Sequence, residues 1–272
     1  MSVGVKGWRR YVPSPAVLAS IVVVLVAWQL LSMVLPGYQF PDLQHLVDAL
    51  IQVLTYQTRY DPVSNIGMTL LRIVLSFVLV MVLGTATGVY MGLSKVTEDY
   101  LSTFVVVLLT VPSVIWAFLA VIWFGLRELL VPLFVIGILI YPYVTVNMWE
   151  GTKDIDPDLF EMAEAFGAHR SQVWRDIIIP HLTPYTFSTM RIAFTLCWKL
   201  ALVAEIFGAS TGVGVVIHTY YQNFSTDMII AWALPIMFLM LVVEQVFQYL
   251  ERRSYRWQPN AEVDSTDIEA VE

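Results

Sequence analysis

Six long apolar runs constrain this chain more than any other feature of its sequence. They lie at residues 15–35, 66–93, 101–124, 129–149, 186–209 and 228–250. An apolar helix needs roughly 20 residues to cross the hydrocarbon core of a bilayer, and each run reaches that length. Inside lipid every backbone polar group must find its partner within the protein, so such runs fold as helices. The sequence therefore predicts an all-α integral membrane protein with six transmembrane helices.

The composition agrees with a membrane setting. Hydrophobic residues make up 58% of the chain and charged residues only 14%, and the mean hydropathy is +0.70. The length of 272 residues leaves no room for a second large domain beside a membrane domain at 15–257. Much of the net charge of −7 comes from the acidic residues of segment 258–272. We expect this short polar tail to be disordered.

Basic residues are distributed unevenly between the two sides of the predicted membrane domain. If segment 1–14 lies inside, only Arg59 and Arg127 fall outside. The basic residues that then flank the cytoplasmic ends are Lys6, Arg9, Arg10, Lys95, Lys153, Arg170, Arg175, Arg191, Arg252, Arg253 and Arg256. By the positive-inside rule both termini are predicted to be cytoplasmic. The first apolar run is too long for a cleaved signal, so we interpret it as a retained span.

Two further segments carry local structural signals. Residues 42–56 have apolar side chains at helical spacing, which predicts an amphipathic helix on the outer surface. Pro112 interrupts the third apolar run, while Pro132 and Pro142 punctuate the fourth. Prolines are tolerated in membrane helices where neighbours satisfy the freed carbonyl groups. We therefore expect kinks within these two spans.

The longest polar connection, residues 150–185, lies between the fourth and fifth spans. Asp156 followed by Pro157 predicts a helix start over 157–166. Gly167 suits a stop with positive φ, Ser171 is a candidate cap for a second helix, and Pro180 is expected to end that helix. Such a polar helix–turn–helix must sit in water at the membrane face. The residues alone leave open whether it enters a cleft in a partner protein or rests on lipid headgroups.

The residues of this loop resemble a known motif. Glu161-x-Ala163-x-x-x-Gly167, nine residues and then Ile177-x-Ile179-Pro180 is similar to the coupling motif of binding-protein-dependent ABC importer permeases. The family pattern has Glu-Ala-Ala, three residues, Gly, nine residues and Ile-x-Leu-Pro, so Met162 and Ile179 depart from it mildly. The resemblance extends over about residues 65–257. Segments 69–72, 123–125, 203–205 and 208–214 look most like the branch that imports sulfonates, taurine, nitrate, bicarbonate or pyrimidine precursors.

The resemblance implies a type I importer permease in the bacterial inner membrane. Two such chains, expected to be identical, would form the pathway across the lipid bilayer, and an extracytoplasmic binding protein would deliver the solute. Each loop would dock on a cytoplasmic ATPase subunit. The residues implied in this coupling are Glu161, Ala163, Glu164, Ala165, Gly167, Ala168, Arg170, Ile177 and Pro180.

A separate motor agrees with the sequence itself. The chain has no Gly-x-x-x-x-Gly-Lys-Ser/Thr loop with which to hold a nucleotide's phosphates. We therefore expect ATP and Mg²⁺ on the partner ATPase, no cofactor on this chain, and no nucleic-acid partner. The four histidines are scattered without metal-ligand spacing, so no metal site is predicted.

Charged residues inside the spans are costly unless they are paired or hydrated, so they are candidates for function. Glu205 and Lys199 lie on faces of the fifth span roughly 120° apart and are not expected to pair with each other. Glu205 shares a face with Trp198. It either lines the pathway or gate, or it is a structural anchor for backbone amides or Arg72. We favour the anchor, because an unpaired carboxylate would repel an anionic solute.

The remaining candidates are weaker. Lys199 is positioned to attract an anion in transit, and Gly212 and Gly214 permit a tight turn just outside the fifth span. Glu244 is expected to snorkel towards water or to pair with Arg191.

Other classes of function fit the sequence less well. The main alternative is an ion-coupled secondary transporter, which would need its own coupling site of intramembrane carboxylates. Glu205 and Glu244 are the acids best placed for that role, and no inverted repeat is evident. A membrane-embedded hydrolase would need a nucleophile and base at membrane depth, which no span supplies. The sequence therefore predicts a transport subunit and not an enzyme.

Overall fold

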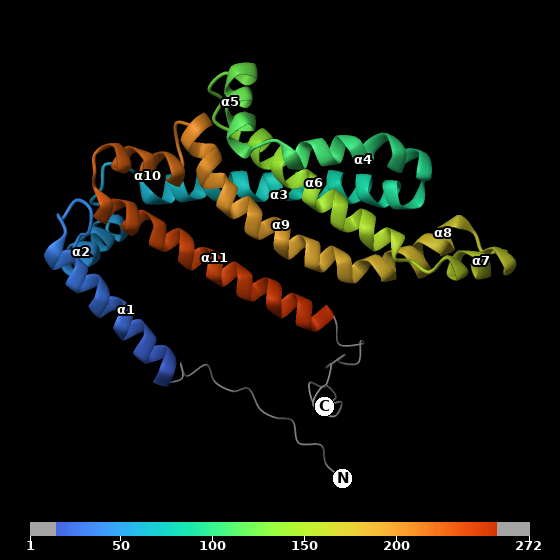
Figure 1. Cartoon of the computed structure of the whole chain (residues 1–272), viewed down its shortest axis with the longest axis horizontal. Helices are drawn as coiled ribbons and strands as arrows, with labels where there is room; N and C mark the ends of the chain where they lie inside the picture. The colour runs from blue at the N-terminus through green and yellow to red at the C-terminus, as the bar shows by residue number, and fades with distance from the viewer. Residues whose placement is uncertain (1–14, 255–272) are drawn as a thin grey trace, which may run out of the picture. The chain divides into compact units, whose positions relative to one another are not determined.

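A computed structural model of the chain describes residues 15–254 (Figure 1). Segments 1–14 and 258–272, for which we predict a cytoplasmic location, lie outside the described residues. Every regular element between residues 15 and 254 is a helix. They are α1 (Pro15–Val34), α2 (Leu43–Leu54), α3 (Pro62–Leu93), α4 (Lys95–Thr110), α5 (Ser113–Phe124), α6 (Leu130–Lys153), α7 (Pro157–Ala165), α8 (Arg170–Gln172), the π-helical segment η1 (Val173–Ile178), α9 (Ile179–Gly208), α10 (Val213–Gln222) and α11 (Thr226–Ser254).

The described helices account for four to six membrane spans. Helices α1, α3, α6 and α11 are each long and apolar enough to cross a bilayer. Two further candidates are bent pairs: α4 with α5, at 99°, and the helix ending at Gly208 with α10, at 60°. Counting each bent pair as one span gives the six that the sequence predicts.

The third predicted span, 101–124, is therefore not one straight helix. Helix α4 ends at Thr110, and Val111 takes an extended conformation with ψ of 125°. A residue before proline is pushed out of the helical region, and Pro112 itself has no N–H to donate. The sequence located the break at Pro112, but the expectation of a kink understated a turn of 99°.

The second half of the polar loop also differs from the sequence prediction. Pro180 does not end a helix, because it lies in the first turn of α9, where a missing N–H is tolerated. The helix is continuous from Arg170 through η1 to Gly208, and the N–H of Ile179 donates five residues back to Trp174 O. Ser171 is not the cap either. The N–H of His169 donates to Gln172 Oε1 at 2.7 Å, so His169 precedes the first turn.

The described chain divides into two compact units. The first unit runs to Pro62 and includes residues 217–234. In it the Trp28 indole N–H donates to Pro41 O at 3.0 Å, and the N–H of Leu43 donates to Gln29 Oε1 at 3.2 Å. These bonds tie α2 to the end of α1. Helix α2 is amphipathic as predicted, with a buried face at Ala49 and Val53 and an exposed apolar stripe at Val47, Ile51 and Leu54.

The second unit comprises residues 63–216 and the chain from Pro235 onward, and it holds the packed core. Helices α3, α6 and α9 lie side by side in it (Figure 1). Gly84, Gly88 and Gly92 of α3 face α6, and a Cβ on Gly88 would lie 2.4 Å from Thr145 O. Small residues at this spacing let two membrane helices approach closely. Helix α9 packs against α6 and is thereby held at the centre of this unit.

Candidate functional site

One candidate site is the turn between α7 and α8, at the N-terminal end of the helix that continues into α9. The Asp156 carboxylate accepts the N–H of Asp158 at 3.0 Å, with Pro157 in the first turn. At the other end, the N–H of Gly167 donates to Glu164 O and the N–H of Ala168 to Ala163 O, both at 2.9 Å. Gly167 has φ of +67°. This pair of bonds around a left-handed glycine is a Schellman motif, which confirms the predicted start and stop of α7.

The structure divides the predicted coupling residues into two groups. Ala163 is buried, and Ala168 and Ile177 are half-buried, so these three pack within the loop. The exposed members are Glu161, Glu164, Ala165, Gly167, Arg170 and Pro180. Two exposed apolar residues of this loop were not among the predicted coupling residues: Phe166, which is 84% exposed, and Met162, which is 48% exposed. Their apolar character beside charged neighbours was the available signal.

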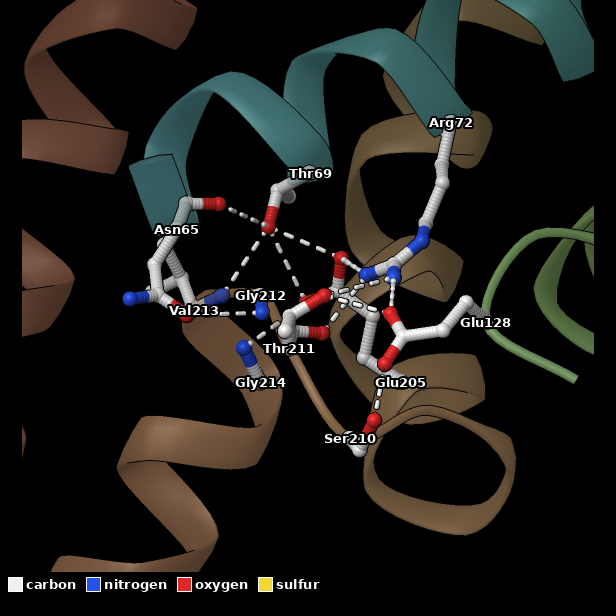
Figure 2. A network of polar contacts seen from close by, with 10 residues as sticks. All are labelled: Asn65, Thr69, Arg72, Glu128, Glu205, Ser210, Thr211, Gly212, Val213 and Gly214. Carbon is white, nitrogen blue, oxygen red and sulfur yellow. Dashed lines mark hydrogen bonds and ion pairs between the residues drawn. The ribbon is translucent and has the colours of Figure 1, made fainter. Parts of the chain in front are cut away.

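The second candidate site is a cluster of charged and polar side chains at the C-terminal end of α9 (Figure 2). Arg72 of α3 and Glu205 of α9 are both fully buried, and Arg72 Nη1 donates to Glu205 Oε1 at 2.7 Å. The same nitrogen donates to Thr211 O at 2.7 Å. Arg72 Nη2 donates to Glu128 Oε2 at 3.0 Å, so one guanidinium serves two carboxylates.

Glu205 and two side chains of α3 also cap the N-terminus of α10. The N–H of Gly212 donates to Asn65 Oδ1 at 2.8 Å, and that of Val213 to Thr69 Oγ1 at 3.0 Å. The N–H of Gly214 donates to Glu205 Oε2 at 2.8 Å. The first N–H groups of a helix have no intrahelical partner and carry partial positive charge. The carboxylate of Glu205 therefore stabilises the start of α10. The same interaction offsets part of the free-energy cost of burying this carboxylate.

Gly212 and Gly214 are required by this close approach. Gly212 has φ of +111°, and a Cβ there would lie 2.5 Å from Glu205 Cδ. A Cβ on Gly214 would lie 2.4 Å from Leu202 O. Real Cβ atoms are not found so close to other heavy atoms, so a side chain at either position would force its neighbours to move.

Glu128 joins the cluster from the segment between α5 and α6, and sequence reasoning missed it. Its carboxylate accepts hydrogen bonds from the hydroxyls of Ser210 and Thr211, the latter at 2.5 Å. Those hydroxyls and the Arg72 guanidinium hold the pKa of Glu128 below its usual range. Its side chain remains 43% exposed, unlike those of Arg72 and Glu205. Nothing local in the sequence marks Glu128 as a partner of residues so far along the chain.

The cluster is not fully satisfied. Arg72 Nε and Ser76 Oγ, one turn apart on α3, are buried polar atoms without a hydrogen-bond partner among the described residues. One guanidinium also faces two carboxylates, which leaves an excess negative charge close to the α10 N-terminus. Partly satisfied buried networks stabilise less than apolar cores of the same volume. Stability alone does not account for such an arrangement.

The structure places the other predicted pathway residues apart from the cluster. Trp198 is buried and Lys199 is exposed on α9, and neither belongs to the ten residues of Figure 2. The predicted pairing of Glu244 is confirmed, because Arg191 contacts its carboxylate at 2.8 Å. Both acids that an ion-coupled transporter would use are therefore engaged with arginine. Between residues 15 and 254, no group of three or more His, Cys, Asp or Glu side chains is arranged to hold a metal ion.

Comparison with known proteins places these features in a family. Residues 80–255 match the family described as binding-protein-dependent transport system inner membrane component. The taurine transport system permease protein of Escherichia coli is 25% identical over 245 residues, which cover 88% of each chain. The nitrate import permease protein of Synechocystis is 26% identical, covering 90% of this chain and 92% of that protein.

Solved structures agree at the level of the fold. A bacterial ABC transporter that imports the acidic polysaccharide alginate matches with a TM-score of 0.62 at 17% identity, covering 88% of this chain and 96% of that one. The MetNI methionine ABC transporter, in inward-facing conformations, matches with a TM-score of 0.57 at 19% identity, covering 70% and 92%.

Proposed function

The chain belongs to the family of binding-protein-dependent transport system inner membrane components, and from this premise we propose how it is driven, what it carries and with what it assembles. It is a membrane-embedded permease subunit of an ABC importer and not itself an enzyme. The segment 157–180 docks on a separate cytoplasmic ATPase subunit, which binds ATP and Mg²⁺. Movement of that ATPase switches the spans between inward-open and outward-open states.

The exposed turn after α7 carries this proposal. Phe166 and Met162 project exposed apolar side chains close in the sequence to the exposed, charged Glu161 and Glu164. An exposed aromatic side chain beside a rigid turn is the type of residue that dominates the affinity of protein interfaces. Lipid headgroups, the alternative that the sequence left open, would favour an apolar stripe along a longer helix over a helix of only nine residues.

The continuous helix from Arg170 to Gly208 supports transmission of the movement. A docked ATPase would push on α7 and α8, and α9 follows without an intervening loop. Rigid helices of this kind move as bodies in domain-closure transitions. The mechanical link between the docking turn and the membrane core is therefore α9.

The proposed cargo is a small oxyanion of the sulfonate or nitrate class. Permeases named for taurine and nitrate transport are among the relatives that match most of the chain. An extracytoplasmic binding protein delivers the solute, and two copies of this chain form the pathway in the inner membrane. Lys199, exposed on α9, is the pathway residue that would attract an anion. Both termini are proposed to be cytoplasmic.

Affinity capture of the tagged chain from its native membranes tests the docking. We expect the wild-type chain to retain an ATPase subunit, identified by mass spectrometry, and Gly167→Arg to lose it. Gly167→Asn is the matched control, because asparagine tolerates positive φ better than other side chains and adds less bulk. Retention of the ATPase by Gly167→Arg, together with wild-type uptake, would rule out the docking role.

Orientation and cargo have separate tests. Reporter fusions after Lys95 and Glu251 should both report the cytoplasm, and an outside signal from either would reject the topology. Uptake of radiolabelled taurine and nitrate into vesicles that contain the captured complex and its binding protein tests the cargo class. Uptake of neither taurine nor nitrate above the level in protein-free vesicles would exclude this cargo class.

A further inference from the structure

We propose that Glu128 is a releasable latch: a positioning residue that joins the α5–α6 connection, residues 125–129, to the α9–α10 turn, residues 209–212, in the resting state. Release of the latch lets the α9–α10 turn move relative to the α5–α6 connection when α9 is displaced. The inference rests on the proposed function, because it assumes that α9 is driven from the docking turn.

The cluster lies at the end of α9 that is farther from the docking turn. Movement that enters α9 at the docking turn is therefore passed on to other segments at the cluster. Helix α9 has 30 residues, which corresponds to a length of about 45 Å. The docking turn precedes its first residue, and Glu205 lies in its last turn. Glu205 contacts α3 through Arg72 and α10 through Gly214. A displacement of α9 therefore reaches several other segments at this one point.

The two carboxylates that share Arg72 differ in their freedom to leave it. Glu205 is fully buried and also accepts the N–H of Gly214, so separating it from Arg72 would strand two charges away from water. Glu128 is 43% exposed, and water can replace its protein partners as it leaves. The ion pair between Arg72 and Glu205 is thus permanent, whereas the contacts of Glu128 are reversible.

Glu128 is the residue through which the α5–α6 connection reaches the rest of the cluster. It contacts Arg72 and both hydroxyls of the turn, those of Ser210 and Thr211 (Figure 2). Its neighbour Leu126 is 78% exposed, and Gly125 has φ of +69° with open space around it. When Glu128 withdraws, this connection loses three polar contacts at once while Arg72 keeps Glu205 and Thr211 O.

Arg72 also has bonding capacity that the resting arrangement does not use. Its Nε has no partner among the described residues, and neither has Ser76 Oγ on the next turn of α3. Native proteins rarely leave buried donors unused, and exceptions mark strained or working parts. An arginine with a spare donor can re-pair when Glu128 leaves, which is what a two-state latch requires.

The first test compares Glu128→Gln with the adjacent control Arg127→Gln in the complete complex in liposomes. Arg127 is exposed and lies outside the cluster. We expect Glu128→Gln to raise ATP hydrolysis without binding protein by about threefold or more, and to lower transport per ATP by a similar factor, with only a small drop in the melting temperature at pH 7. Arg127→Gln should behave as wild type. Unchanged hydrolysis and unchanged transport per ATP in Glu128→Gln would overturn the latch.

The second test locks the latch and applies even if Glu128→Gln assembles poorly. Glu128→Cys and Thr211→Cys are combined with Cys197→Ala and joined by a reducible bifunctional methanethiosulfonate. We expect cross-linking to lower uptake at least tenfold, and a reductant to restore it. Uptake by the cross-linked complex at the rate of the unlinked one would refute the proposal.

The two proposals fail separately. If Gly167→Arg retains the ATPase and transports normally, the docking role falls while the cross-linking result still reports on the latch. If the cross-linked complex transports freely while Gly167→Arg loses the ATPase, docking stands and the latch falls.

Discussion

The two ends of α9 carry opposite kinds of residue, and each kind lies where it is least stable. An apolar side chain is exposed at one end, and charged side chains are buried at the other. At the docking turn, Phe166 holds an aromatic ring 84% exposed on a polar loop. At the other end, Arg72 and Glu205 hold charges that are fully buried inside the protein. The cluster finds its partners within the chain, from four separate segments. In the docking turn the backbone hydrogen bonds are made within the turn, and the exposed side chains are available to a partner protein.

This difference separates two ways in which a residue can matter. Residues of the cluster should affect the folded state of the permease itself. Substitutions of the exposed side chains of the docking turn should leave that state intact and affect only assembly with a partner. Substitutions at the two ends therefore provide a direct test, and we order them by the largest free-energy change expected of each, in folding or in association with a partner.

Arg72→Leu should have the largest effect. It leaves the buried Glu205 carboxylate without its cation and also deprives Glu128 of a partner. Removing one member of a buried pair costs about 3–5 kcal/mol. We expect little monodisperse protein after detergent extraction, measured by size-exclusion chromatography of a fluorescent fusion. A wild-type yield and melting temperature would show that the cluster is not what holds this end together.

Gly214→Ala and Gly167→Ala form a matched pair across the two ends. The new Cβ at residue 214 would lie 2.4 Å from Leu202 O, whereas at residue 167 it meets nothing within 4 Å. Overpacking against backbone costs about 3 kcal/mol, and a non-glycine residue at positive φ costs about 1 kcal/mol. The melting temperature of Gly214→Ala should lie well below that of Gly167→Ala. The reverse order would contradict the proposed difference between the two ends of α9.

Glu205→Gln should have an intermediate effect. Glutamine keeps the volume and one acceptor for the N–H of Gly214, but it removes the charge that faces Arg72. Loss of a charged hydrogen bond costs about 2 kcal/mol. We expect lower assembly with an unchanged ratio of taurine to nitrate uptake. Altered selectivity in a well-assembled complex would instead place Glu205 in the pathway.

Phe166→Ala should leave the stability of the chain within about 0.5 kcal/mol, because the ring is exposed. Association with the ATPase should weaken by about 2 kcal/mol, or roughly thirtyfold in Kd, if Phe166 is an interface anchor. Titration of the purified subunits by microscale thermophoresis measures this. Equal loss of melting temperature and of affinity would mean that Phe166 supports the fold.

The pH dependence of Glu128 should be the smallest effect. Its pKa lies below the usual 4.5, so its contribution to stability is complete above about pH 4.5 and is lost as the pH falls through the lowered pKa. Solvent screening keeps this contribution below about 1 kcal/mol. The melting temperatures of wild type and Glu128→Gln should differ by a constant amount from pH 7 to about pH 5, and should converge only as the pH falls below 4.5 through the lowered pKa. A gap that already closes above about pH 5 would need another cause.

The features that the sequence predicted correctly depend on residues that are close together along the chain. Asp156, Pro157 and Gly167 act on backbone within a few residues, and the helix and turn they predict are present. Arg72 and backbone amides were named as alternative anchors for Glu205, and the structure uses both.

Longer-range features escaped the sequence. Glu128 lies 56 residues from Arg72 and 83 from Thr211, and no periodicity reports such a contact. Pro180 was misinterpreted because a proline that ends one helix and a proline in the first turn of another leave the same local pattern. The size of the bend at Pro112 depends on what α5 packs against, which is a property of the fold.

The unbroken helix from the docking turn to the cluster also fixes a rotational phase. Each residue of an α-helix turns the chain by 100°, so one inserted residue in α9 would swing Glu205 away from Arg72 while leaving every apolar residue apolar. The π-helical segment η1 shows that this helix already departs from regular α-helical geometry just before Pro180. The number of residues in α9 therefore sets the direction in which Glu205 points. Residues can be added to or removed from the helix only in numbers that return Glu205 to the same face.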